Sequence, residues 1–191
     1  MVNKKPYSRL EVDERRAQLL ELGTDLFSEH GYDDLSMARI ARAGGVSKAL
    51  LYHYFPSKRD YFLATMGQVT AQLTELTQPD PDAPAYEQVD QALAAFLDWM
   101  DSNSAAYAKL MQSSTSVGVV GQVIATVRAQ TAQRILDGVV EGESGPADRA
   151  AVQGWLWFMD GACLDWIEHR DIDKDELRAL LLRTLKGALK R

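Results

Sequence analysis

The sequence predicts an all-α protein of about nine helices, and three observations support this fold class. Apolar residues recur at spacings of three and four along most of the chain, as they do on one face of a helix. No segment alternates apolar and polar residues over a strand length between turn residues. The 191 residues are 46% hydrophobic and 25% charged, enough apolar surface for a substantial core. We therefore expect a helical protein with either one large domain or a small domain joined to a larger one.

Capping and helix-breaking residues delimit the first four predicted helices, at about residues 11–30, 36–43, 47–54 and 58–76. Gly31 ends the first of these helices, because glycine readily adopts the left-handed conformation that closes a helix. Ser36 and Ser47 are N-cap residues, and Gly44-Gly45 separates the two short helices. Pro56 cannot continue the third helix, so a long fourth helix begins just after it.

The remaining helices follow a proline-rich loop at 79–84, where three prolines in six residues exclude regular helix. They are expected at about residues 85–102, 105–112, 119–140, 147–169 and 174–189, with a loop at 142–146 before the last two. We divide the chain into an N-terminal domain at 1–57 and a C-terminal helical bundle at 58–191.

The two short helices have the pattern of a helix-turn-helix. Such a unit needs a small residue where the helices cross, a turn residue that tolerates positive φ, and apolar anchors on the second helix. The sequence supplies these in order: Ile40 and Ala41 in the first helix, Gly45 in the turn, then Val46, Leu51 and Tyr54. A short buried helical hairpin is the alternative interpretation of this pattern.

The stretch 35–58 strongly resembles the N-terminal domain of the TetR family of bacterial regulators. The resemblance depends on three elements taken together: Val46-Ser47-Lys48, the run Leu51-Tyr52-His53-Tyr54-Phe55, and Ser57-Lys58. The detailed match covers about residues 11–65, and the six-helix remainder has about the length of the family's second domain. The resemblance implies a DNA-binding transcription regulator, most simply a repressor that a small-molecule effector releases from its operator.

In such a regulator the second short helix enters the major groove by its N-terminal end. Lys48 and Ala49 are then the candidates for contact with base edges, because Lys48 donates to guanine and Ala49 permits close approach or touches a thymine methyl. The expected phosphate contacts come from Ser36, Ser47, Tyr52, His53, Tyr54 and Lys58. Ordinary packing is the alternative role for the two tyrosines, and a solvated surface position is the alternative for His53. Leu50 departs from the small or hydroxyl residue that the family often has there, which places one phosphate contact in doubt.

The charge of the chain is unevenly distributed. The net charge of −6 argues against nucleic-acid binding at first sight, because phosphate contacts depend on lysine and arginine. Through Thr65, however, ten Lys or Arg stand against nine Asp or Glu, whereas the remainder has eleven against eighteen. This asymmetry fits a DNA-contacting head on an acidic body, although an acidic solvated surface without a partner is the simpler interpretation.

One short recognition helix reads few base pairs, so a homodimer on a near-palindromic operator of double-stranded DNA is expected. The last two helices are the candidates for the dimer interface, because both are apolar on more than one side, and the resemblance implies a four-helix interface there. The residues we assign to it are Gly161, Ala162, Trp166, Leu177, Leu181 and Leu185. A wholly intramolecular core is the alternative for this set.

The resemblance also implies an effector pocket in the second domain. Aromatic and thioether side chains are plentiful there and suit a lipophilic or planar ligand. The pocket residues we assign are Trp99, Tyr107, Met111, Trp155, Phe158 and Asp160. Any of them could instead be core, and Asp160 could bond to a neighbour or reach solvent.

Other functions have little support in the sequence. An enzyme is disfavoured because the three histidines lie far apart, and there is no phosphate-cradling glycine loop or nucleophile elbow. We expect no cofactor and no metal site, since the single cysteine, Cys163, cannot make a structural zinc site. Without an apolar signal core or a long apolar run, we expect a cytoplasmic protein with no membrane partner. A dimeric ligand-binding adaptor without DNA function is the main alternative.

Overall fold

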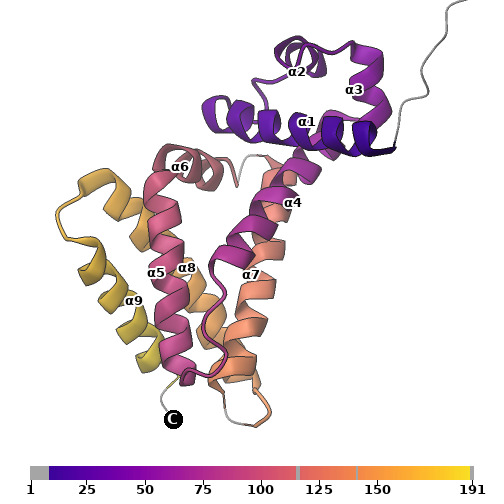
Figure 1. Cartoon of the computed structure of the whole chain (residues 1–191). Helices are drawn as coiled ribbons and strands as arrows, with labels where there is room; N and C mark the ends of the chain where they lie inside the picture. Colours follow the sequence, from indigo (N-terminus) through magenta and orange to yellow (C-terminus); the bar gives the residue numbers. More distant parts are fainter. Residues whose placement is uncertain (1–8, 115–116, 141, 190–191) are drawn as a thin grey trace, which may run out of the picture. The chain divides into compact units, whose positions relative to one another are not determined.

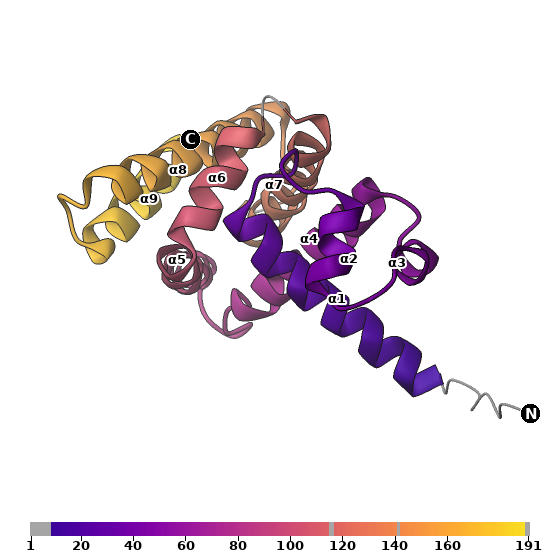
Figure 2. The same cartoon turned by 90° about the horizontal axis from the view of Figure 1, so that it is seen from above.

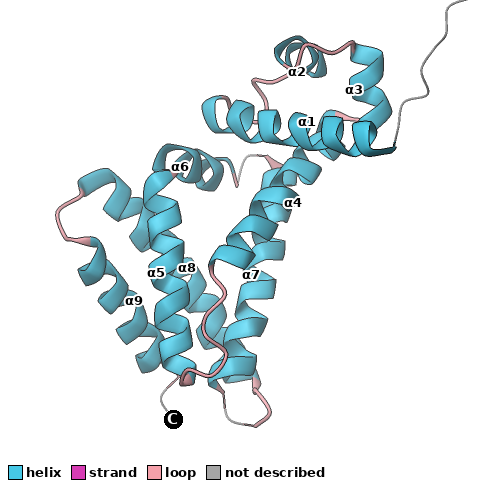
Figure 3. Ribbon diagram, in the orientation of Figure 1, coloured by secondary structure: helices cyan, strands magenta, loops and turns pink. Residues whose placement is uncertain are grey.

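The computed structural model describes residues 9–114, 117–140 and 142–189 as helices joined by loops, with no strand in these ranges (Figures 1 and 3). The basic residues Lys4 and Lys5 lie outside the described residues. The chain divides into two compact units, 1–69 and 70–191. The boundary between these two units lies within the fourth helix, whereas the expected division lay just before that helix, at 57/58.

The first unit contains α1 (Arg9–Glu29), α2 (Met37–Ala43), α3 (Lys48–Tyr54) and the beginning of α4 (Lys58–Leu76). In this unit α1 packs against α2, and α2 packs against α3 (Figures 1 and 2). Tyr61, Phe62, Thr65 and Met66 of α4 are buried in it. These side chains explain why the unit extends to residue 69, because α4 supplies one wall of its core.

Aromatic side chains connect α4 to α1 and to the residue that follows α3. The rings of Phe27 and Phe62 meet edge to face with centroids 4.9 Å apart, and those of Phe55 and Tyr61 do the same at 4.9 Å. The Tyr61 hydroxyl donates to the carbonyl of Leu19 at 2.5 Å. A buried phenol with a hydrogen-bond partner contributes packing without leaving a polar group unpaired.

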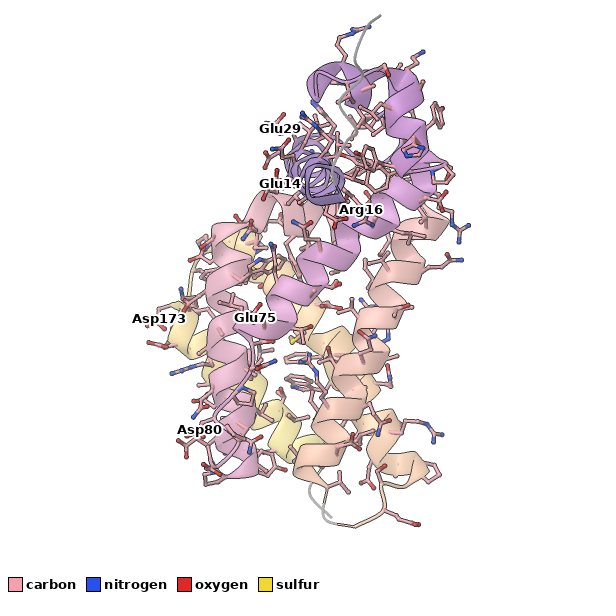
Figure 4. The ribbon with its side chains drawn as sticks, turned by 45° about the vertical axis from the view of Figure 1, so that its right-hand side comes forward. Glu14, Arg16, Glu29, Glu75, Asp80 and Asp173 are labelled. Carbon is pink, nitrogen blue, oxygen red and sulfur yellow. The ribbon has the colours of Figure 1, made fainter. Side chains whose placement is uncertain are left out.

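The second unit contains α5 (Ala85–Ser102), α6 (Ser104–Ser113), α7 (Gly118–Val139), α8 (Pro146–His169) and α9 (Lys174–Ala188), together with the end of α4. Helix α8 packs against both α7 and α9, and α9 packs against α5. The Nε1 of Trp155 donates to the carbonyl of Leu181 at 2.9 Å inside this core. Asp173, labelled in Figure 4, caps α9 by accepting from the amide of Glu176 at 2.7 Å.

Candidate nucleic-acid interface and subunit-contact face

Hydrogen bonds at three points fix the start of α2, the start of α3 and the turn between these helices. The Ser36 hydroxyl accepts from the amide of Arg39 at 3.3 Å, and the Ser47 hydroxyl accepts from the amide of Leu50 at 3.1 Å. Between these caps Gly45 has φ of +61°, and the amide of Val46 donates to the carbonyl of Ala41 at 3.0 Å. The predicted caps and the predicted positive φ are therefore confirmed.

Helix α3 presents one face to solvent and anchors the other. Leu51 has no exposed surface and the following Phe55 is 2% exposed, whereas Lys48, Ala49 and His53 are exposed. Successive side chains are about 100° apart around a helix, so Ala49 and His53 lie opposite Leu51. This places the outward face of α3 where a groove-binding helix needs it.

The other predicted DNA contacts differ in availability. Tyr52 is 48% exposed, so its hydroxyl is free to reach a phosphate. Tyr54 is half-buried, with its ring centroid 6.3 Å from that of Phe55, in agreement with the packing alternative. Ser36 and Ser47 use their oxygens as helix caps and still have a hydroxyl hydrogen to donate.

Lys58 has a partner within the chain that the sequence did not reveal. Its Nζ donates to the carbonyl of Tyr32 at 2.9 Å and lies 4.2 Å from the centre of the Tyr32 ring. Burial and the neighbouring Asp33 charge raise the pKa of the Tyr32 phenol, and the Arg59 charge opposes this. A phosphate contact by Lys58 would have to compete with the Tyr32 carbonyl.

The structure also exposes candidates that sequence reasoning missed. Arg39 and Arg42 of α2 are exposed, and Arg39 Nη2 lies 2.8 Å from His30 Nε2. Leu50 is 36% exposed in the first turn of α3. The spacing of three between the two arginines on a short helix was the signal available in the sequence.

Most of the residues assigned to the dimer interface are buried within the second unit. Trp166, Leu177, Leu181 and Leu185 are at most 6% exposed and belong to the core of their own unit. Ala162 is half-buried, and of the assigned set only Gly161 is exposed. The wholly intramolecular alternative therefore holds for these four side chains.

A different stripe of α8 faces solvent. Trp157 is 62% exposed and Phe158 is 42% exposed, and Gly154 and Gly161 flank them at spacings of three. A Cβ built on either glycine meets no atom within 4 Å. We call these four residues the α8 contact stripe, since two adjacent exposed aromatic rings between glycines are typical of an interaction surface.

Most of the predicted pocket residues belong to the core of the second unit or pack against it. Tyr107 and Trp155 are buried, Trp99 and Met111 are half-buried against the same core, and Phe158 points to solvent. Two cavities, of about 420 and 180 Å³, lie elsewhere. The larger is lined by Leu136, Asp137, Gly142, Glu143 and Ser144, and the smaller by Ala94, Leu97, Asp98, Lys174, Asp175 and Arg178.

Asp160 has its partners inside the chain. It is 8% exposed and accepts from the Tyr107 hydroxyl at 2.9 Å and from Arg128 Nε at 2.7 Å. Of the two alternatives to a ligand contact, the bond to a neighbour is therefore correct and the path to solvent is wrong.

Neither a metal-binding cluster nor a membrane-spanning helix is present among the residues that the structure describes. Within the described ranges, no group of three or more His, Cys, Asp or Glu side chains is placed to hold a metal ion. Over the same residues, none of the helices combines the length and the apolar character needed to cross a bilayer.

Comparison with known proteins gives a consistent result over both units. Residues 19–65 match the model of the bacterial regulatory proteins of the tetR family, and residues 85–186 match the tetracyclin repressor-like C-terminal domain. The HTH-type transcriptional activator FasR of Mycolicibacterium smegmatis is 29% identical over 88% of this chain and 80% of its own length. YhgD, an HTH-type transcriptional regulator of Bacillus subtilis, is 26% identical over 91% of this chain and 96% of its own.

Solved structures agree with the sequence matches. A tetR-family transcriptional regulator from Streptomyces coelicolor superposes with a TM-score of 0.78 at 26% identity, over 92% of this chain and 80% of that one. The C-terminal model alone matches more than half of the chain, and the N-terminal model covers the helix-turn-helix described above. The chain therefore belongs to the TetR family of DNA-binding transcription regulators.

Proposed function

We propose that the protein binds a near-palindromic operator as a homodimer, represses transcription from it, and is released by a small-molecule effector. The observation that carries the proposal of DNA binding is the exposed face of α3. Leu51 anchors this helix in the core, and the side chains left exposed to solvent are Lys48, Ala49, Tyr52 and His53. The short α3 has only seven residues, so it reads few base pairs, and a second copy doubles the operator.

The α8 contact stripe supports a second copy of this chain as the partner. Trp157 and Phe158 leave a large apolar surface in water, and the open space at Gly154 and Gly161 lets another helix approach closely. A two-fold interface uses the same patch on both subunits, which a self-complementary stripe of this kind satisfies.

The effector proposal has a more limited basis. Trp99 of α5 and Met111 of α6 pack, half-buried, against the core that contains Tyr107 and Trp155. Such aromatic and thioether side chains suit a lipophilic or planar molecule, and methionine adapts its shape to a ligand. Phe158 is left out of this proposed pocket because it faces solvent.

Repression is proposed because a dimer seated on a promoter excludes polymerase without further contacts. A reporter gene placed behind the operator distinguishes repression from activation. If the protein is a repressor, expression of the reporter should rise when the regulator is absent. Lower expression without the regulator would assign an activator, the role that its name gives to the relative FasR.

Fluorescence anisotropy on labelled duplexes from around the protein's own gene tests the DNA proposal. Lys48→Ala should lower the affinity by about 1–3 kcal/mol if Lys48 contacts a base, or reduce the salt slope by about one if it contacts a phosphate. Arg134→Ala, which removes one exposed positive charge from α7, is the matched control and should bind as the wild type does. The same titration with 8-anilinonaphthalene-1-sulfonate, an amphipathic dye with apolar aromatic rings and one anionic sulfonate, should show release of DNA as the dye binds.

If both Lys48→Ala and Tyr52→Ala left the affinity for DNA unchanged, the proposal that the exposed face of α3 contacts DNA would be contradicted. If the wild type also failed to bind any duplex at low salt, a dimeric adaptor without DNA function would replace the regulator as the proposal. Dye binding without release of DNA would leave the DNA function in place and remove the proposed effector pocket.

A further inference from the structure

Three helices of the second unit meet at the carboxylate of Asp160. Tyr107 of α6 donates its hydroxyl to Oδ1 at 2.9 Å. Arg128 of α7 donates from Nε to Oδ2 at 2.7 Å, with its Nη2 2.5 Å from the same oxygen. Both oxygens of a buried carboxylate are thus occupied, one by a neutral donor and one by a cation. We call these three residues the Asp160 cluster.

The cluster continues to the surface through Arg128. The guanidinium carbon lies 3.7 Å from the centre of the Trp157 ring, whose side chain is the most exposed of the large apolar side chains that the structure describes. Trp157 and Asp160 are one helical turn apart on α8, so a single Arg128 side chain holds both. A guanidinium is planar and both stacks on a ring and donates in its own plane, which an ammonium group cannot do.

The hydroxyl of Tyr107 is a secure donor in this arrangement. Burial, and after it the charge of Asp160, raises the pKa of the phenol far above its ordinary value. The phenol therefore stays protonated, and its hydrogen bond fixes the carboxylate that orients Arg128. Leaving a buried carboxylate without partners costs free energy. We therefore expect Tyr107 and Arg128 to stay bonded to Asp160 when any of the three helices shifts.

We propose that Arg128 is a positioning residue for the subunit contact: it holds the Trp157 ring in the orientation that meets a second copy, and Asp160 with Tyr107 holds Arg128. This inference rests on the proposed dimer through the α8 contact stripe. It makes the affinity between subunits depend on α6, which contributes no residue to the stripe. A displacement of Tyr107 loosens Arg128, and the Trp157 ring loses its fixed orientation.

The dissociation constant of the full-length dimer, measured by sedimentation equilibrium, tests the proposal. Tyr107→Phe removes only the hydroxyl, and Arg128→Lys keeps the charge but loses the planar group. Each should raise the dissociation constant roughly fivefold or more in the wild-type background and change it less than about twofold in a Trp157→Leu background, because coupled residues are non-additive. Tyr86→Phe in α5, a tyrosine outside the cluster, is the matched control and should leave the constant unchanged.

The possible outcomes separate this inference from the proposed dimer. If Trp157→Leu leaves the dissociation constant unchanged, the α8 contact stripe is not the interface, and both proposals are wrong. If Trp157→Leu weakens the dimer while Tyr107→Phe and Arg128→Lys do not, the interface stands and the positioning role is overturned. The positioning role would also be overturned if Tyr107→Phe and Arg128→Lys had equal effects with and without the Trp157 ring. Such a result would mean that the two substitutions act on the fold in general.

Discussion

Gly45 shows how one residue determines the backbone path of the helix-turn-helix formed by α2 and α3. Its φ of +61° is strained for any residue with a Cβ, and no atom lies within 4 Å of the position that the Cβ would take. The requirement at this position is therefore one of backbone conformation and not of space. Gly44, by contrast, would place a Cβ 3.0 Å from Leu22 Cδ2, so the two adjacent glycines serve different purposes.

Gly45→Ala should lower the free energy of unfolding by about 1–2 kcal/mol, the cost of a left-handed alanine. Gly67→Ala, in α4 with equally open space, should raise it by about 0.5–1 kcal/mol, because alanine restricts the unfolded chain. Urea denaturation followed by circular dichroism measures both. Equal effects at the two positions would show that the φ of Gly45 is not what selects glycine.

At the scale of the elements, caps and periodicity predicted most of the fold. The limits of α4 and α5 agree with those expected, and α2 and α3 begin one residue after the expected ranges because those ranges include the N-cap serines. Helices α8 and α9 differ by one residue at one end, and α6 and α7 differ by one residue at each end. Helix α1 begins two residues before the expected Glu11. These limits are local properties, because serine caps, glycines and prolines act on the residues beside them.

The site residues that sequence reasoning misplaced depend on contacts distant in the chain. Helix α8 is apolar on several sides, and periodicity alone cannot decide that Trp155 points inward while Trp157 points outward. The partner of Lys58 is the carbonyl of Tyr32, 26 residues earlier. Each assignment needs the packing of a second helix, which a single sequence does not supply.

An ion ladder joins α5 to α9 and the residues just before it. Arg170 Nη1 lies 2.6 Å from Asp101 Oδ1, Lys174 pairs with Asp98, and Arg178 Nε lies 3.6 Å from Asp90 Oδ1. The side chains of Arg170 and Asp101 are 40% and 37% exposed, so water screens their attraction. We expect these ion pairs to fix the orientation of α9 against α5 while contributing little to the free energy of unfolding.

Asp101→Asn should therefore lower the free energy of unfolding by only about 0.2–1 kcal/mol, against about 2–5 kcal/mol for Leu181→Ala in the adjacent core. The hydrogen bond from Arg170 lowers the pKa of Asp101, so its contribution is present above the ordinary aspartate pKa and disappears as the pH falls through the lowered value. Urea midpoints at neutral and acidic pH measure both effects. A loss at Asp101 as large as that at Leu181 would mean that the pair is effectively desolvated.

For the whole molecule, the net charge of −6 repels DNA. DNA binding therefore requires that attraction by the positive charges of the helix-turn-helix exceed this repulsion. It also requires two heads, since one α3 contacts few base pairs. Affinity for a full operator should then depend on the dimer, whereas affinity for half an operator should not.

Phe158→Asp should produce a monomer, because it places a charge in the middle of the apolar contact stripe. Binding to the full operator should fall by a factor of roughly 100 or more, with half-operator binding unchanged. Ile172→Asp is the matched control: its side chain is 38% exposed but lies outside the stripe, and it should remain dimeric. Light scattering and anisotropy on both duplexes provide the measurements, and a dimeric Phe158→Asp variant would contradict the proposed interface.

The buried position of Cys163 makes the protein convenient for spectroscopic labelling. This single cysteine has no exposed surface, and burial together with the Asp160 charge raises the pKa of its thiol to about 12, so little reactive thiolate forms at neutral pH. A cysteine introduced on the surface outside the proposed DNA contacts, such as Asp25→Cys in α1, would then carry a spin label alone, without removal of the native thiol. Pulsed electron resonance on that variant would report the spacing of the two N-terminal units in a dimer, with and without DNA.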